Sequence, residues 1–278
     1  MPISLEFINI IEDISNVVDL PLIKEIVTPQ NRENAKKSNF SVIILEDNSV
    51  GLIYINLSSK IKTKFKNEEF TYLKGSEPLS IIKLFNSKDL FERSLSLGVI
   101  NAVSQFIFKK TNFLFDFTSD SLGLLDIKSS DIIGMVGFFP PLVKLIEKIG
   151  SKLIVIEKKE ELVQKSKDWL VTLNPSKLKD CNKILITGTT VLNDTLDEVL
   201  DYCTSAEKKS VIGPTTSFLP DPLFRRGIDV IGGTYVSKSD LLAQAIHQSI
   251  RWSDSVKKYT IERKNYPSYK ELISKFST

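Results

Sequence analysis

Four short apolar runs between Asp131 and Thr234 end in glycine with threonine or proline close by: DIIGMVG, ILITGTT, SVIGPTT and DVIGGTY. Sharp turns at such places expose hydroxyl groups and backbone amides, which can hydrogen-bond a small molecule. Because strand ends meet at one edge of an open α/β sheet, we expect these turns to form one binding crevice. A plain turn is the alternative for each of them alone, so the prediction depends on their repetition.

The first turn is followed by a carboxylate at the end of the next apolar run. Gly134 and Gly137 frame the turn, and Glu157 lies twenty residues after Gly137. An acid at this offset in dinucleotide-binding folds accepts hydrogen bonds from ribose hydroxyls. The turn departs from that fingerprint, because Phe138 stands where close approach of a pyrophosphate requires glycine. Glu157 is therefore either a ligand contact or a solvated carboxylate that precedes the charged run 158–161.

The second turn precedes a helical pattern. Thr195 and Glu198 have the spacing of a capping box, so a helix is expected to start there, directed at the loop of residues 187–193. Free N–H groups at a helix start attract anionic or carbonyl oxygens, and hydroxyl and amide side chains can complete such a shell.

The few cysteines and histidines restrict metal binding and nucleophilic catalysis. Cys181, Cys203 and His247 make up the whole supply, without a C-x-x-C pair. A closed site for zinc or another soft metal usually takes four nitrogen or sulfur ligands. A metal held by one subunit must therefore use oxygen ligands such as Glu157 or arrive inside a small chelator. No G-x-S-x-G or phosphate-binding glycine run occurs, and no catalytic residue or metal ligand is assigned.

Strand-like runs alternate with helical patterns in this half of the chain, which predicts a mostly parallel sheet with right-handed crossovers. The expected strands are residues 131–136, 152–156, 183–187, 210–212 and 228–231, and the expected helices begin near residues 140, 195 and 239.

The N-terminal half predicts a smaller α+β domain. Residues 40–57 predict a hairpin, and residues 60–66 alternate lysine with less polar side chains, as in a half-buried strand with a basic solvent face. A helix is expected over about residues 89–108. Gly98 in its middle costs about 1 kcal/mol of helix propensity relative to alanine, so we expect a close contact there. Asn101, on nearly the same face, either reaches the crevice or hydrogen-bonds a neighbouring loop.

Several of these runs together resemble a known family. Between about residues 88 and 250, the segments ERSLSLGVINAV, GMVGFFPPL, VIEK, TGTTVLNDTLDEVL and IGPTTSFLPDPLFRRGIDVIGGTYV are similar to the heavy-metal-chelation family, whose function is unknown. The resemblance implies an N-terminal domain similar to the enolase N-terminal fold, a C-terminal Rossmann-like domain and a site between them. With Phe138 added from the first turn, the candidate ligand-binding residues are Asn101, Gly137, Phe138, Glu157, Thr187, Gly188, Thr190, Asn193, Gly213, Pro214, Thr215, Gly232 and Thr234.

Length and composition agree with two soluble domains. The chain has 278 residues, of which 42% are hydrophobic and 26% charged. A linker is expected over residues 118–130, which predicts domains over residues 1–122 and 123–278. A net charge of +3 is too small to indicate a nucleic-acid partner. The apolar runs are too short for a membrane span, and acidic residues near the start do not fit a signal peptide, so we expect a cytoplasmic protein.

Three functions remain open. The first is binding of a small molecule or metal chelate in an interdomain cleft, with a role in metal handling. The second is an enzyme with a nucleotide-type cofactor such as S-adenosylmethionine, whose ribose Glu157 would hold. The third is a regulatory or interaction module without catalysis. Residues 268–276 could form a short helix that docks on its own chain or on a neighbouring subunit, so a homo-oligomer also stays open.

Overall fold

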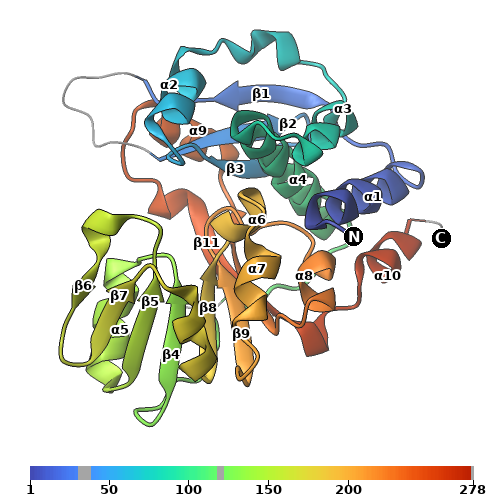
Figure 1. Cartoon of the computed structure of the whole chain (residues 1–278). Helices are drawn as coiled ribbons and strands as arrows, with labels where there is room; N and C mark the ends of the chain where they lie inside the picture. Colours follow the sequence, from blue (N-terminus) through green and yellow to red (C-terminus); the bar gives the residue numbers. More distant parts are fainter. Residues whose placement is uncertain (31–38, 118–121, 277–278) are drawn as a thin grey trace.

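The computed structural model describes residues 1–30, 39–117 and 122–276. Their strands form a small antiparallel sheet and a large, mostly parallel sheet, with helix α4 (Leu90–Lys110) between them (Figure 1). This confirms the predicted α/β fold class with a smaller α+β part.

The small sheet has the order β1 (Ile23–Val27), β2 (Phe40–Leu45) and β3 (Val50–Tyr54). Both of its faces are covered. Ile43 and Leu45 point into the main core, which α4 shares, whereas Val42 and Ile44 pack with Leu242 and Ile246 of helix α9 (Ser239–His247). This explains why β2 is continuously apolar from Val42 to Leu45 rather than alternating. It also means that a helix late in the sequence completes the N-terminal sheet.

Helix α4 is buried on all sides, because nearly every residue from 91 to 108 is inaccessible to solvent. It crosses β3 at two glycines. A Cβ on Gly51 would collide with the carbonyl oxygen of Gly98, and a Cβ on Gly98 would collide with Ile53. The close contact predicted for Gly98 is therefore present, and it is a contact with the protein backbone and core.

The large sheet has the order β11-β10-β9-β8-β4-β5-β7-β6. Its inner strands are parallel, and only the outermost pairs, β10 with β11 and β6 with β7, are antiparallel. The bounds are β4 (Ile132–Val136), β5 (Lys152–Ile156), β6 (Gln164–Lys165), β7 (Trp169–Thr172), β8 (Lys183–Thr187), β9 (Lys208–Ile212), β10 (Val230–Val236) and β11 (Val256–Glu262).

The chain reverses its direction of travel across this sheet at β4. It lays β5 and β7 on one side of β4 and then returns to place β8, β9 and β10 on the other. With the six parallel strands numbered along the chain, this is the 3-2-1-4-5-6 order of dinucleotide-binding folds. The crevice of such a sheet lies beyond the carboxyl ends of the two strands at the reversal, here β4 and β8.

The remaining helices cover the sheets. They are α1 (Ile3–Ser15), α2 (Ser59–Asn67), η1 (Phe70–Leu73), α3 (Pro78–Ile82), η2 (Lys83–Asn86), α5 (Pro140–Ile149), η3 (Glu160–Leu162), η4 (Pro175–Asp180), α6 (Thr189–Leu192), α7 (Leu196–Asp201), α8 (Asp221–Arg225), η5 (Ser253–Ser255), η6 (Arg263–Asn265) and α10 (Tyr269–Ser274). In the described part of the chain, no helix combines the length and apolar character needed to cross a membrane.

The main apolar core continues across the predicted division at residue 122. It includes side chains from α1 and α4 as well as from β8, β10 and α10. Helix α10 docks on its own chain, because the Tyr269 hydroxyl donates to Asp13 at 2.6 Å and the Tyr269 amide donates to Asp221 at 3.0 Å. The domain bounds stay a prediction, and residues 118–121 of the expected linker lie outside the described residues.

The strand expected over residues 60–66 is wrong, because this segment is helix α2. Ile61 and Phe65 are four residues apart and both buried, so the apolar period is that of a helix, while the lysines occupy its other faces. The Ser58 hydroxyl caps the helix by accepting from the Ile61 amide at 3.2 Å.

Candidate functional site

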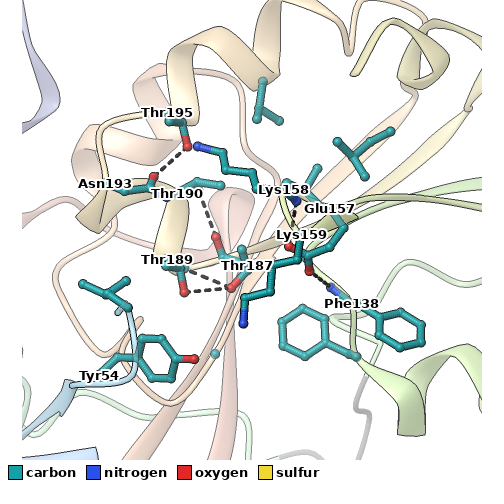
Figure 2. A pocket seen from close by; sticks show the side chains of 18 of the residues that line it. Tyr54, Phe138, Glu157, Lys158, Lys159, Thr187, Thr189, Thr190, Asn193 and Thr195 are labelled. Carbon is teal, nitrogen blue, oxygen red and sulfur yellow. Dashed lines mark hydrogen bonds between the residues drawn. The ribbon is translucent and has the colours of Figure 1, made fainter. Parts of the chain in front are cut away.

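A cavity of about 580 Å³ opens where β4, β5, β8 and β9 end, at the point where the strand order reverses. The small sheet forms the opposite wall through Phe40 and Tyr54 and the residues that follow β3, Asn56 and Leu57. The cavity therefore lies between the two sheets, and its position is that of the ligand crevice of doubly wound folds. Figure 2 shows Tyr54 on this wall, facing Thr187 and Thr189 at the end of β8.

At the first strand end, the Glu157 carboxylate binds the turn that follows β4. Its Oε2 accepts from the Phe138 amide at 3.0 Å and its Oε1 accepts from the Lys158 amide at 2.7 Å (Figure 2). Gly137 has a φ of +92°, a backbone conformation that glycine adopts readily, and the chain turns sharply there at the end of β4. Helix α5 then begins with two prolines, which contribute no N–H groups.

The second strand end supplies hydroxyl groups. Thr187 donates through Oγ1 to Thr189 Oγ1 at 3.2 Å, and the Thr190 hydroxyl donates back to the Thr187 carbonyl at 2.8 Å. The Asn193 side-chain amide is hydrogen-bonded to the Thr195 hydroxyl at 2.6 Å. The predicted capping box does not form, since the Thr195 side chain bonds Asn193 and makes no cap to helix α7.

The third strand end is a loop held by one buried threonine. Gly213 has a φ of +153°, and the Thr216 hydroxyl lies 2.6 Å from the Gly213 carbonyl and 2.5 Å from the Gly232 carbonyl. This arrangement ties the end of β9 to β10 and presents Pro214 and Thr215 to the cavity.

A buried arginine fixes helix α6 from the N-terminal part of the chain. Arg93 of α4 donates to the carbonyls of Leu192 at 2.7 Å and Val191 at 3.3 Å, and also to the Phe85 carbonyl at 2.8 Å. These bonds satisfy carbonyls at the end of α6, which otherwise lack partners. Burial lowers the pKa of Arg93, and the nearby Asp194 carboxylate opposes that effect.

Two lysines are the functional candidates that the sequence interpretation missed. Lys158 and Lys159 line the cavity, and Figure 2 shows the Lys158 side chain extending toward Thr195 and the Lys159 side chain toward Thr187 and Thr189. Within the described part of the chain, neither ammonium group has a hydrogen bond or ion pair to a neighbouring side chain. The signal that could have identified them is the charged run 158–161, which directly follows Glu157.

The structure brings most of the predicted site residues together. Ten of them line the cavity: Gly137, Phe138, Glu157, Thr187, Gly188, Thr190, Asn193, Gly213, Pro214 and Thr215. Asn101, Gly232 and Thr234 do not line it. Asn101 is fully buried and hydrogen-bonds the backbone of a loop, Gly232 packs on Ile212 inside the sheet, and the buried Thr234 accepts from Ser217 through its carbonyl at 2.8 Å.

The side chains do not fit a directly bound heavy metal. No group of three or more histidine, cysteine, aspartate and glutamate side chains suited to a metal ion occurs among the described residues. Both cysteines are buried, and burial raises the pKa of Cys181 to about 12 and that of Cys203 to about 11. Because the thiolate is the metal-binding form, neither thiol is prepared to hold a metal ion at neutral pH.

Comparison with known proteins places this architecture in a family. Residues 120–264 match the DUF364 family, described as "Putative heavy-metal chelation". An uncharacterized protein of Methanocaldococcus jannaschii is 32% identical over 189 residues, which cover 65% of this chain and 70% of that protein.

Two solved structures of DUF364 proteins with unknown function share the fold. The protein from Pyrococcus horikoshii has a TM-score of 0.67 at 18% identity, covering 94% of this chain and 98% of its own. The protein from Desulfitobacterium hafniense has a TM-score of 0.68 at 22% identity, covering 93% and 98%. At these identities the likeness is evidence for the fold alone. Because the family match over residues 120–264 spans more than half of the 278 residues, the chain belongs to the DUF364 family.

Proposed function

We propose that this protein binds a small organic molecule, specifically one that wraps a metal ion, in the cavity between the two sheets. The observation that carries the proposal is a cavity of about 580 Å³ with several hydroxyl groups and two ammonium groups that bond no side chain among the described residues. Such groups recognise the carboxylate or other oxygen atoms of a chelator.

The family description mentions heavy-metal chelation, whereas the described residues around the cavity lack a set of metal-ligating side chains, and binding of a pre-formed chelate is consistent with both. The described residues supply no cluster of metal ligands, so a bare ion would find few protein donors. A chelate brings its own donors and presents its outer oxygens to Lys158, Lys159 and Thr189. Under this proposal the protein recognises the chelator and leaves the coordination sphere to it. A cytoplasmic location and a homo-oligomeric state stay predictions from the sequence.

A nucleotide-type cofactor such as S-adenosylmethionine is the second candidate, supported by one observation. Glu157 directly follows the second strand, β5, of a 3-2-1-4-5-6 sheet, where an acid commonly accepts from ribose hydroxyls. A pyrophosphate-bearing dinucleotide is less favoured, because the first turn offers it few free N–H groups. S-adenosylmethionine carries no phosphate and avoids this conflict.

The test is binding of Ni²⁺ chelates, measured by thermal shift and calorimetry. Wild-type protein is titrated with the Ni²⁺ complexes of iminodiacetate, oxydiacetate and nitrilotriacetate, with Ni²⁺ alone and with S-adenosylmethionine. We expect a chelate to stabilise the protein and Lys159→Ala to weaken that binding about tenfold. The matched control is Lys152→Ala, an exposed lysine at the opposite end of β5.

Each remaining result has a clear meaning. Stabilisation by S-adenosylmethionine alone, lost in Glu157→Ala, would replace the chelate proposal with the cofactor proposal. Stabilisation by bare Ni²⁺ equal to that by every chelate would contradict recognition of the chelator. Elemental analysis of protein purified without added metal provides an independent measurement of bound metal.

A further inference from the structure

We infer that the ligand is an aminocarboxylate, with an N–H group directed at Glu157 and carboxylates directed at Lys158, Lys159 and Thr189, and that phosphate groups are disfavoured at the first turn. This inference rests on the proposed function and names the chemical class of its ligand.

The first turn has few of the donors that bind phosphate in related folds. A phosphate at a strand–helix turn receives N–H groups from the turn and from the first turn of the helix. Here the Gly137 amide donates to the Ile156 carbonyl at 2.9 Å, and the Phe138 amide donates to Glu157. The next helix positions are Pro140 and Pro141, which have no N–H. The Leu142 amide already donates to the Phe139 carbonyl at 2.9 Å.

The Glu157 carboxylate places a negative charge where a phosphate would lie in related folds. It lies at the positive end of the ten-residue helix α5, bonded to an amide just before the helix starts. An incoming phosphate would meet this negative charge, whereas a protonated amine or another N–H donor would meet an acceptor. Each carboxylate oxygen accepts one backbone N–H from Phe138 or Lys158 and retains capacity for a second bond.

The side chains that extend from Glu157 toward helix α6 favour oxyanions. Lys158 and Lys159 contribute positive charge, and Thr189 contributes a hydroxyl donor. Since Thr189 Oγ1 accepts from Thr187, its own proton remains available for a ligand. The cavity thus offers an acceptor at Glu157 and donors at Lys158, Lys159 and Thr189, which matches a molecule with both an amine and carboxylates.

The test compares two ligands that differ only in the group between their two carboxylate arms. Iminodiacetate carries a secondary amine between its two carboxylates, and oxydiacetate carries an ether oxygen there. The amine retains an N–H group both when free and when it coordinates Ni²⁺. We expect iminodiacetate to bind wild-type protein at least about tenfold more tightly than oxydiacetate, as free ligands and as Ni²⁺ complexes, the effect of one hydrogen bond to a charged group.

The second part of the experiment repeats this comparison in a variant of Glu157, the proposed hydrogen-bond acceptor. Glu157→Gln removes the negative charge and keeps an amide of similar size. We expect it to reduce the preference for iminodiacetate to about threefold or less, and to strengthen binding of inorganic phosphate. Lys152→Ala serves again as the control, and circular dichroism checks the fold of each variant.

The outcomes separate this inference from the proposed function. Equal binding of the two ligands by wild-type protein would overturn the aminocarboxylate assignment while leaving chelate binding intact. Failure of every chelate to bind would overturn both. A preference for iminodiacetate that persists unchanged in Glu157→Gln would contradict the role given to that carboxylate, whatever the variant's stability.

Discussion

The side-chain amide of Asn101 donates to the carbonyl of Thr215 at 3.1 Å, and so connects buried helix α4 to a loop that lines the cavity. The same nitrogen lies 3.3 Å from the Leu52 carbonyl of β3. One side chain therefore bonds both the small sheet and the loop that follows β9. The two walls of the cavity are held at a fixed separation from the inside, although Asn101 itself does not line the cavity.

Replacing Asn101 with leucine is expected to destabilise the protein by about 1–3 kcal/mol, because the buried Thr215 carbonyl loses its donor. Urea unfolding measures this change. Chelate binding should also weaken, since Thr215 lies in the cavity wall. The control is Asn265→Ala, which removes an exposed amide that donates to Glu262 at 3.4 Å. An unchanged free energy of unfolding for Asn101→Leu would show that the bond to Thr215 does not matter.

Arg93→Lys is expected to destabilise the protein by about 1–3 kcal/mol although it keeps the charge. The guanidinium reaches three carbonyls at once, and a lysine ammonium cannot reproduce that planar fork. Because two of these carbonyls end helix α6, hydrogen exchange in residues 189–192 should increase as well. The matched variant is Arg251→Lys, whose arginine is exposed. Equal effects of the two substitutions would contradict a specific role for Arg93.

The parallel sheet was predictable because its strands are buried, short and bounded by glycine or proline. The helix over residues 89–108 was also predicted nearly at its true bounds, α4. Strand β11 was missed because Lys257 and Lys258 interrupt the apolar pattern expected of a strand. Such lysines are common on an edge strand, and β11 lies at the edge of the sheet, beside β10. The segment 60–66 was misassigned because every second residue is lysine, which has the period of a strand. Ile61 and Phe65 are also four residues apart, which fits a helix, and their burial decides between the two.

The candidate site was predictable where it consists of strand ends, and less so where it depends on packing. Gly137, Thr187 and Gly213 follow apolar strands, so their convergence follows from the topology of the sheet. Tyr54 enters the cavity from the other sheet, and no local pattern encodes how two sheets face each other. Asn101 has the spacing of a site residue, but its helix is buried on both sides, which directs its amide into the protein interior.

Acid should weaken a buried ion pair at the other end of the sheet. The Asp131 carboxylate lies 2.8 Å from the Lys183 ammonium, and both side chains are about nine-tenths buried. Burial by itself would raise the pKa of Asp131, but hydrogen bonds from Lys183, Asn182 and the Lys128 amide lower it from 3.8 to about 2. A lowered pKa in the folded state means that the stabilisation is present above about pH 4 and is lost as the pH falls toward 2.

Asp131→Asn should therefore be less stable than wild type by about 3 kcal/mol at pH 7, because it leaves Lys183 buried without its counterion. The difference between the two proteins should shrink between pH 4 and pH 2, as measured by urea unfolding across that range. Asp168→Asn, at an exposed position beside the same sheet, should differ from wild type by a constant small amount. A pH-independent gap for Asp131→Asn would contradict the lowered pKa.

The cysteines are expected to take no part in binding a metal chelate. Cys181 and Cys203 are buried, and their thiols donate to the Lys177 carbonyl at 3.6 Å and the Val199 carbonyl at 3.2 Å. Their pKa values, raised by burial to about 12 and about 11, keep both thiols protonated at neutral pH.

A thiol reagent such as dithiobisnitrobenzoate should label neither residue in the folded protein and should label both in guanidinium. The double variant Cys181→Ala, Cys203→Ala should lose about 1–3 kcal/mol of stability through the small cavities it creates, yet keep the full thermal shift with a Ni²⁺ chelate. Loss of that shift in a variant that still folds would assign the metal to the thiols and contradict recognition through Lys158, Lys159 and Glu157.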